Sequence, residues 1–217
     1  MEKKRPPSPR KRKKAPPSEY HHGNLRAALI AAGLQLLARG RDEGLSLRAV
    51  ARLAKVSHSA PYRHFADKTE LLAGLAEEGY RRFAAAMESA AQAAGDPTSA
   101  LMATGEAYVR FGLGHPELFH LMFDGRLALD ATPGLHTASE GAYAVLVKYV
   151  SGLPHAAAMS PEQREAFAVS QWAYAHGLTL LILKRQLAHL PLGQMAPEKI
   201  LSHLQRTLGP PAPAPSR

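Results

Sequence analysis

The sequence predicts an all-α protein in which a three-helix unit precedes a larger helical domain. Apolar residues recur at helical spacing through the middle of the chain, and no stretch alternates convincingly with the period of two that strands require. Ala, Leu and Arg recur while β-branched residues are sparse, a composition that also favours helix. The 217 residues are enough to bury a sizeable core.

The two ends of the chain differ in composition from the middle. Residues 1–17 contain five prolines and eight Lys or Arg, so we expect a disordered basic arm there. Residues 209–217 are rich in proline, and we expect a disordered tail. Between these ends, the predicted domains are the three-helix unit over 18–68 and the larger helical domain over 69–208.

The first two helices of the three-helix unit are indicated by apolar faces and by capping residues. Gly40 and Gly44 bracket the polar turn that ends the first helix. Ser46 is placed to cap a short second helix. The apolar face of the first helix is formed by Leu25, Leu29, Ala32 and Leu36, and the inward residues of the second are Leu47, Val50, Ala51 and Ala54.

A third helix is expected from Ser57, its N-cap, to Phe65, after a tight connection over 55–57. Its inward residues are expected to be Val56, Ala60 and Phe65. Pro61 interrupts the segment because its ring crowds the carbonyl of Ser57 and it donates no amide. The helix is therefore expected to start late or to open with a tight 3₁₀ turn.

The remaining helices are indicated by caps and prolines. Asp67 and Glu70 form a predicted capping box for a long helix that ends near 95–97. Prolines 116, 161 and 197 each stand where a helix would begin, the position that proline tolerates best. The later helices are expected over about 98–113, 116–123, 134–151, 161–189 and 197–208.

Basic charge is concentrated in the first third of the chain, whose positive charge exceeds the formal net charge of +9 because the remainder is slightly negative. Residues 1–14 hold eight Lys or Arg and one acidic residue. Residues 69–217, in contrast, hold eleven Lys or Arg and thirteen acidic residues. A polyanionic partner for the basic third follows, because neutralised phosphates release counterions. Solubility alone is the alternative reading of this charge.

Two short helices joined by a tight turn fit a helix-turn-helix, whose second helix enters the major groove of DNA. The hydroxyl, imidazole and phenol groups over 57–64 suit phosphate and base contacts, although an ordinary surface helix would explain them too. The segment Tyr20–Tyr80 resembles the N-terminal region of TetR-family repressors. The resemblance is carried by YHHGNLRAALIAAGLQLL, by SLRAVARLAKVSHSAPYRHFADKTELL, and most specifically by Tyr62-Arg63-His64-Phe65 followed by Lys68.

The resemblance implies which residues face DNA. Ser46 and Arg48 would contact the backbone at the start of the second helix, and Phe65 would be structural. Pro61 is a departure from a regular recognition helix, and it affects which of the neighbouring side chains reaches base edges. For Arg63 two alternatives stay open, a contact with DNA and a position in solvent. The groove-facing set is Ser57, His58, Ser59 and Ala60, and the phosphate-facing set is Tyr62, His64 and Lys68.

The larger domain is expected to bind a small-molecule effector and to form a homodimer. The segment Trp172 to Gly177 resembles the Trp-His-Gly (WHG) type of TetR-like C-terminal domain, with core packing as the alternative. The last two long helices are candidates for the dimer interface, with Phe167, Ser170, Leu178, Leu181, Ile182 and Leu201 as contributors. Simple core packing is the alternative for every effector-binding candidate. These candidates are Tyr108, Phe111, Phe119, Met122, Phe123, Tyr143, Trp172 and His176.

Other classes of protein are disfavoured. H-E-x-x-H, G-x-S-x-G and G-x-x-x-x-G-K motifs are missing from the sequence, so no enzyme, metal site or cofactor is predicted. The absence of cysteine is compatible with the bacterial cytoplasm, and the apolar run over 178–183 is too short for a membrane span. The sequence therefore predicts a repressor that binds a palindromic operator in double-stranded DNA as a dimer and is released by a small-molecule ligand. A non-specific architectural DNA-binding protein is the alternative.

Overall fold

A computed structural model of the chain describes residues 22–40 and 44–207. These residues form eight α-helices and no strand, which confirms the all-α prediction. The arm expected over 1–17 and the tail expected over 209–217 lie outside the described residues. The helices are α1 (His22–Leu37), α2 (Leu47–Leu53), α3 (Lys68–Gln92), α4 (Pro97–Gly114), α5 (Pro116–Phe123), α6 (Pro133–Ser151), α7 (Pro161–Leu183) and α8 (Pro197–Thr207).

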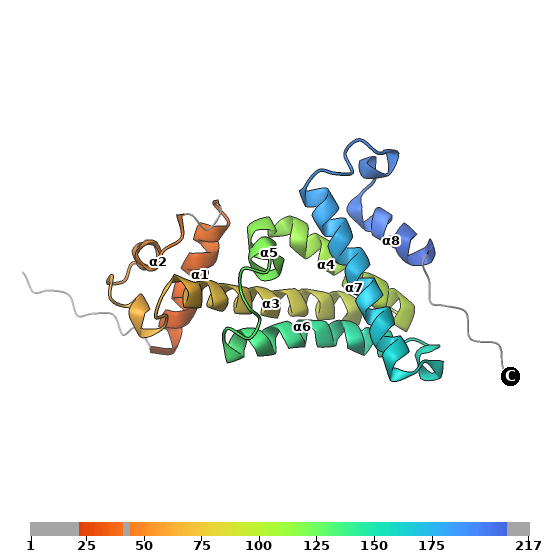
Figure 1. The fold of residues 1–217 in the computed structure, drawn as a ribbon, viewed down its shortest axis with the longest axis horizontal. Coiled ribbons are helices and arrows are strands. Elements are labelled where there is room, and N and C mark those ends of the chain that lie inside the picture. The colour runs from red at the N-terminus through yellow and green to blue at the C-terminus, as the bar shows by residue number, and fades with distance from the viewer. Residues whose placement is uncertain (1–21, 41–43, 208–217) are drawn as a thin grey trace, which may run out of the picture.

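Helix α3 is the axis of the molecule. It runs from the end that holds α1 and α2 along the larger domain, with α6 beside it and α7 crossing obliquely toward α8 (Figure 1). Its first residue, Lys68, coincides with the predicted domain boundary. Because α3 packs against α1 at one end and against α4, α5 and α6 further along, one helix supports both parts of the chain.

Glycines allow α1 to approach α3 closely. A methyl group at Gly33 would come within 2.8 Å of Leu75, and one at Gly74 within 3.0 Å of Phe65. The predicted inner face of α1 is present, since Leu29 and Ala32 are buried and the remaining two leucines are half-buried. This packing seats the three-helix unit on the start of α3.

The predicted caps of α2 and α3 are confirmed. The Ser46 hydroxyl accepts a hydrogen bond from the Ala49 amide at 3.1 Å. The Asp67 carboxylate accepts one from the Glu70 amide at 2.9 Å, and the Glu70 carboxylate accepts one from the Ala66 amide at 2.6 Å. Proline stands first in α5, α7 and α8 as predicted, and it also begins α4 and α6.

Helix α7 ends at Leu183, and the prediction that it continues to 189 is wrong. Arg185 adopts a positive φ of 56°, and the Gln186 amide donates back to the Leu181 carbonyl at 2.9 Å. This pattern is a Schellman motif, which usually has glycine where Arg185 stands. Because glycine is missing here, the end of α7 has no stop signal in the sequence.

Much of the apolar surface of α7 is not covered by the described residues. The helix is long and apolar enough to cross a membrane by length and composition, and 28% of its most apolar window is buried. Val169 is 45% exposed and Leu181 38%. Two of the residues predicted to face a partner chain, Leu178 and Leu201, are instead buried in the chain's own core and are not available for contact.

Candidate DNA-binding surface and ligand cavity

The segment expected to be the recognition helix is not an α-helix. Residues 57–64 form successive tight turns, with a 3₁₀ helix at Pro61–Arg63. Pro61 has no amide to donate to the Ser57 carbonyl, which accepts from the Ala60 amide at 3.0 Å instead. The expected Ser57 cap is therefore wrong, and the Ser57 hydroxyl lies 3.2 Å from the Ser59 hydroxyl.

This recognition segment (residues 57–65) is anchored by two apolar residues. Phe65 is 1% exposed, and Pro61 is also buried. The other two residues predicted to point inward, Val56 and Ala60, are only half-buried. Pro61 thus both prevents a regular α-helix and packs into the protein interior.

The predicted DNA-facing residues lie mostly at the surface. Tyr62 is 53% exposed, an unusual environment for a large aromatic side chain. Ala60 and His64 are half-buried. The exposed members of the set are Ser46, Arg48, Ser57, His58, Ser59, Tyr62 and Lys68.

Positive charge surrounds this surface. Over the described residues 22–40 and 44–68 there are seven Lys or Arg and one acidic residue, Asp67. Arg52 and Lys55 are exposed cations that the sequence interpretation did not single out. Lys55 has a positive φ of 58° because it forms a Schellman motif at the end of α2, where the Val56 amide donates to Ala51.

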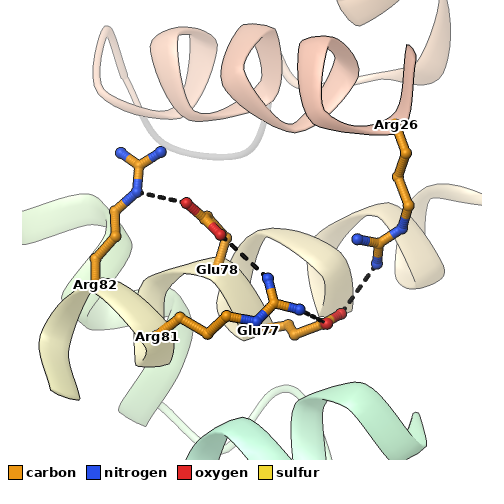
Figure 2. Close-up of polar contacts among 5 residues, drawn as sticks. All are labelled: Arg26, Glu77, Glu78, Arg81 and Arg82. Carbon is orange, nitrogen blue, oxygen red and sulfur yellow. Dashed lines mark hydrogen bonds and ion pairs between the residues drawn. The ribbon is translucent and has the colours of Figure 1, made fainter. Parts of the chain in front are cut away.

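Arg26 connects the recognition segment to α3. Its guanidinium lies over the Phe65 ring, 5.7 Å from the centroid, and also donates to the Glu77 carboxylate at 3.0 Å. Glu77 is 7% exposed and is paired from the other side by Arg81 (Figure 2). Figure 2 also shows Glu78 bridging to Arg81 and Arg82.

The Glu77 carboxylate also lies against the first turn of α6. A methyl group at Gly134 would come within 2.7 Å of Glu77 Oε1, so only a glycine fits here without displacement. The positive end of the α6 dipole favours an anion at this place. Glu77 thereby joins α1, α3 and α6.

A cavity of about 610 Å³ lies in the larger domain between α3, α4, α5, α6 and α7. Residues from α7 line it at helical spacing, at 165, 169, 172 and 176. The loop between α5 and α6 contributes Gly125, Leu127 and Leu129. The lining is mainly apolar and aromatic, as is typical of small-molecule sites.

Six of the eight predicted effector residues line the cavity, and two do not. Phe111 and Phe119 are buried in the core beside it, at 7% and 0% exposure. The sequence interpretation missed Tyr80, Phe83 and Met87 of α3, because their spacing looks like an ordinary core stripe. The six predicted residues in the lining are Tyr108, Met122, Phe123, Tyr143, Trp172 and His176.

A hydrogen-bonded chain occupies the inner wall of the cavity. Trp172 Nε1 donates to the Tyr108 hydroxyl at 3.2 Å, and this hydroxyl lies 2.8 Å from His176 Nδ1. Because the tryptophan only donates, the Tyr108 proton is free to bond Nδ1 of a neutral imidazole. Burial lowers the pKa of His176, which keeps the ring neutral, and burial also raises the pKa of Tyr108.

Two further tyrosines face the cavity, and they differ in whether their hydroxyl groups are hydrogen-bonded. The Tyr80 hydroxyl donates to the Met122 carbonyl at 2.8 Å, and burial raises the pKa of Tyr80 to about 12. The Tyr143 hydroxyl is buried without a hydrogen-bond partner among the described residues. Within the same residues, no group of three or more His, Cys, Asp or Glu is arranged to hold a metal ion.

Comparison with known proteins agrees with both halves of this arrangement. Residues 29–75 match the bacterial regulatory proteins of the tetR family, and residues 101–206 match the tetracyclin repressor-like C-terminal domain. The chain belongs to the TetR family. This TetR-family protein is accordingly a DNA-binding transcriptional regulator, and the segment Trp172 to Gly177 falls inside its matched C-terminal domain.

Solved structures share the fold of this TetR-family protein over most of its length. A Rhodococcus sp. RHA1 protein of unknown function is 32% identical, with a TM-score of 0.74 over 88% of this chain and 96% of that one. A TetR family transcription regulator from Marinobacter aquaeolei VT8 is 18% identical, with a TM-score of 0.59 over 83% of this chain and 93% of that one. No functionally curated protein matches the sequence significantly.

Proposed function

We propose that this TetR-family regulator is a homodimeric repressor that binds a palindromic operator and is released by a small-molecule effector. The observation that carries the proposal is the connection from the recognition segment through Arg26 and Glu77 to α6, which also lines the cavity. Residues 18–68 then serve as the DNA-binding domain and residues 69–208 as the effector and dimer domain. The chain acts in the bacterial cytoplasm and is not an enzyme.

The DNA contacts of the repressor come from the exposed recognition segment. Ser57, His58 and Ser59 face base edges, with Ala60 beside them for contact with a thymine methyl. Phosphates are met by Ser46, Arg48, Tyr62, His64 and Lys68. The exposed Tyr62 ring and the surrounding positive charge support this assignment.

Dimerisation uses the uncovered face of α7. Ala166, Ala173 and Gly177 recur on one side of this helix, and among the described residues nothing lies within 4 Å of a methyl group placed on Gly177. We expect a second chain to make a close helix crossing at this glycine. Two copies related by a two-fold axis present two recognition segments to two half-sites of DNA.

The switch depends on α6. An effector that fills the cavity pushes on Tyr143 and its neighbours, and the displaced first turn of α6 then shifts Glu77 and Arg26. The effector binds the conformer in which the recognition segments are wrongly spaced, and DNA binds the other. The coupling is reciprocal, so operator DNA weakens effector binding by the same factor.

The operator claim is tested by footprinting the protein on the DNA upstream of its own gene. A single protected palindrome is expected for the repressor. The basic residues 1–14 favour the competing function of a non-specific architectural protein, which would give uniform weak coverage instead.

The dimer claim is tested by light scattering of Gly177→Leu. A leucine on the proposed crossing is expected to give monomers at concentrations where the wild type is dimeric. Gly141→Leu is the matched control, because Gly141 also has nothing within 4 Å of an added methyl but lies on α6. Equal masses for the two variants would count against the α7 interface.

A further inference from the structure

The charged side chains of the cavity all carry one sign. Glu140 on α6 and Glu165 on α7 are in its lining, and the lining contains no Lys or Arg among the described residues. Since burial lowers the pKa of His176, the imidazole adds no positive charge near neutral pH. An anionic ligand would therefore meet repulsion without any compensating cation.

The two carboxylates belong to the exposed part of the cavity lining. Both glutamates are exposed, and Glu140 retains 67% of its side-chain surface while lying 3.3 Å from His136. Burial raises the pKa of Tyr143, and the negative charge of Glu165 adds to this effect. The exposed part of the lining therefore carries negative charge close to Tyr143.

Two aromatic rings share the cavity lining with these carboxylates. The Tyr143 and Trp172 rings are 6.0 Å apart, and the Tyr143 hydroxyl has no partner among the described residues. Trp172 is 39% exposed although it lines the cavity. Electron-rich ring faces beside carboxylates are the environment that attracts organic cations.

The inner end of the cavity has no such charge. Trp172, Tyr108 and His176 satisfy one another by hydrogen bonds, and the rings of Phe83 and Phe123 fill the surrounding wall. This end suits an apolar body. Charge recognition is therefore confined to the exposed part of the lining.

We propose that the effector is an organic cation with a bulky apolar body, held by Glu140, Glu165 and the Tyr143–Trp172 pair. This inference deepens the ligand-responsive function proposed above and depends on it. The cation replaces its hydration with ring faces and carboxylates, while its apolar body enters the cavity. A carboxylate ligand of the same size is excluded by charge.

The test uses two ions of matched shape, tetraphenylphosphonium and tetraphenylborate. Trp172 is the single tryptophan of the chain, so its fluorescence reports the cavity directly. The phosphonium is expected to bind about tenfold or more tightly than the borate, which corresponds to about 1.4 kcal/mol. The double variant Glu140→Gln/Glu165→Gln should lose most of this preference, and Glu106→Gln, outside the lining, should keep it.

A neutral probe separates the two levels of the proposal. If N-phenyl-1-naphthylamine binds but the borate equals or exceeds the phosphonium, the cation assignment is overturned while the effector cavity stands. An unchanged preference in the double glutamine variant overturns the role of the two carboxylates. If neither ion nor the naphthylamine binds, the effector function itself fails.

Discussion

The guanidinium of Arg26 and the carboxylate of Glu77 are 3.0 Å apart, although 51 residues separate them in the sequence. The same guanidinium lies over Phe65, at the end of the recognition segment. The same carboxylate lies against Gly134, at the start of α6 (Figure 2 shows the pair). One ion pair therefore connects the DNA-binding surface with a helix that lines the cavity.

Neutralising Glu77 is expected to destabilise the fold. In Glu77→Gln, two guanidiniums lose their buried partner, and we expect unfolding in urea to be easier by about 1–3 kcal/mol. Glu78→Gln is the matched control, because Glu78 forms its pairs on the exposed side of the same helix and should cost at most about 1 kcal/mol. Equal losses in the two variants would refute the special position of Glu77.

Replacing either of two glycines of α6 with alanine is expected to change the stability of the protein, in opposite directions for the two positions. Gly134→Ala crowds the Glu77 carboxylate and should lower the free energy of unfolding by about 1 kcal/mol or more. Gly141→Ala meets open space and should raise it by about 0.4–1 kcal/mol, since alanine restricts the unfolded chain. Chemical denaturation of both variants is the measurement, and a stabilising Gly134→Ala would contradict the contact.

Acid is expected to weaken the larger domain through His176. Burial holds the pKa of His176 below the ordinary value of 6.5, so below that pH the unfolded chain binds a proton that the folded chain does not. Stability therefore falls as the pH drops through this range. Melting temperatures at pH 7.5 and 5.5 should differ less in His176→Asn, whose amide still accepts from Tyr108, and an unchanged difference would exclude this histidine as the cause.

Replacing Arg185 with glycine is expected to stabilise the protein. Its left-handed backbone costs an ordinary residue about 1–2 kcal/mol, so Arg185→Gly should raise the free energy of unfolding by part of this amount. Lys184→Gly, at the neighbouring right-handed cap, should lower it. The comparison is made by urea denaturation, and a loss of stability in Arg185→Gly would argue against the Schellman motif at the end of α7.

The helical fold was predictable because its signals are local. Ser46, Asp67 and the prolines that begin α5, α7 and α8 mark helix starts within a few residues, whatever the tertiary structure. Helix ends were harder to predict, since Lys55 and Arg185 take left-handed conformations that sequence patterns reserve for glycine. Pro61 was recognised as a departure, but its burial was not predictable from spacing.

The candidate site was only partly predictable because a cavity lining and a core stripe share one periodicity. Phe111 and Phe119 face the core, while Tyr80 and Phe83 face the cavity, and all four stand at apolar helical positions. The Arg26–Glu77 pair had no sequence signal, since it joins distant helices. Packing alone distinguishes these cases.

If the recognition segment reads DNA sequence, the protein must distinguish its operator from other DNA. Fluorescence anisotropy measures this with the footprinted operator and a scrambled duplex of the same length and base composition, at one fixed salt concentration. We expect the wild type to bind the operator about 10³-fold or more tightly than the scrambled duplex, and His58→Ala to reduce this ratio. Equal affinity of the wild type for the two duplexes would show that the segment does not read sequence.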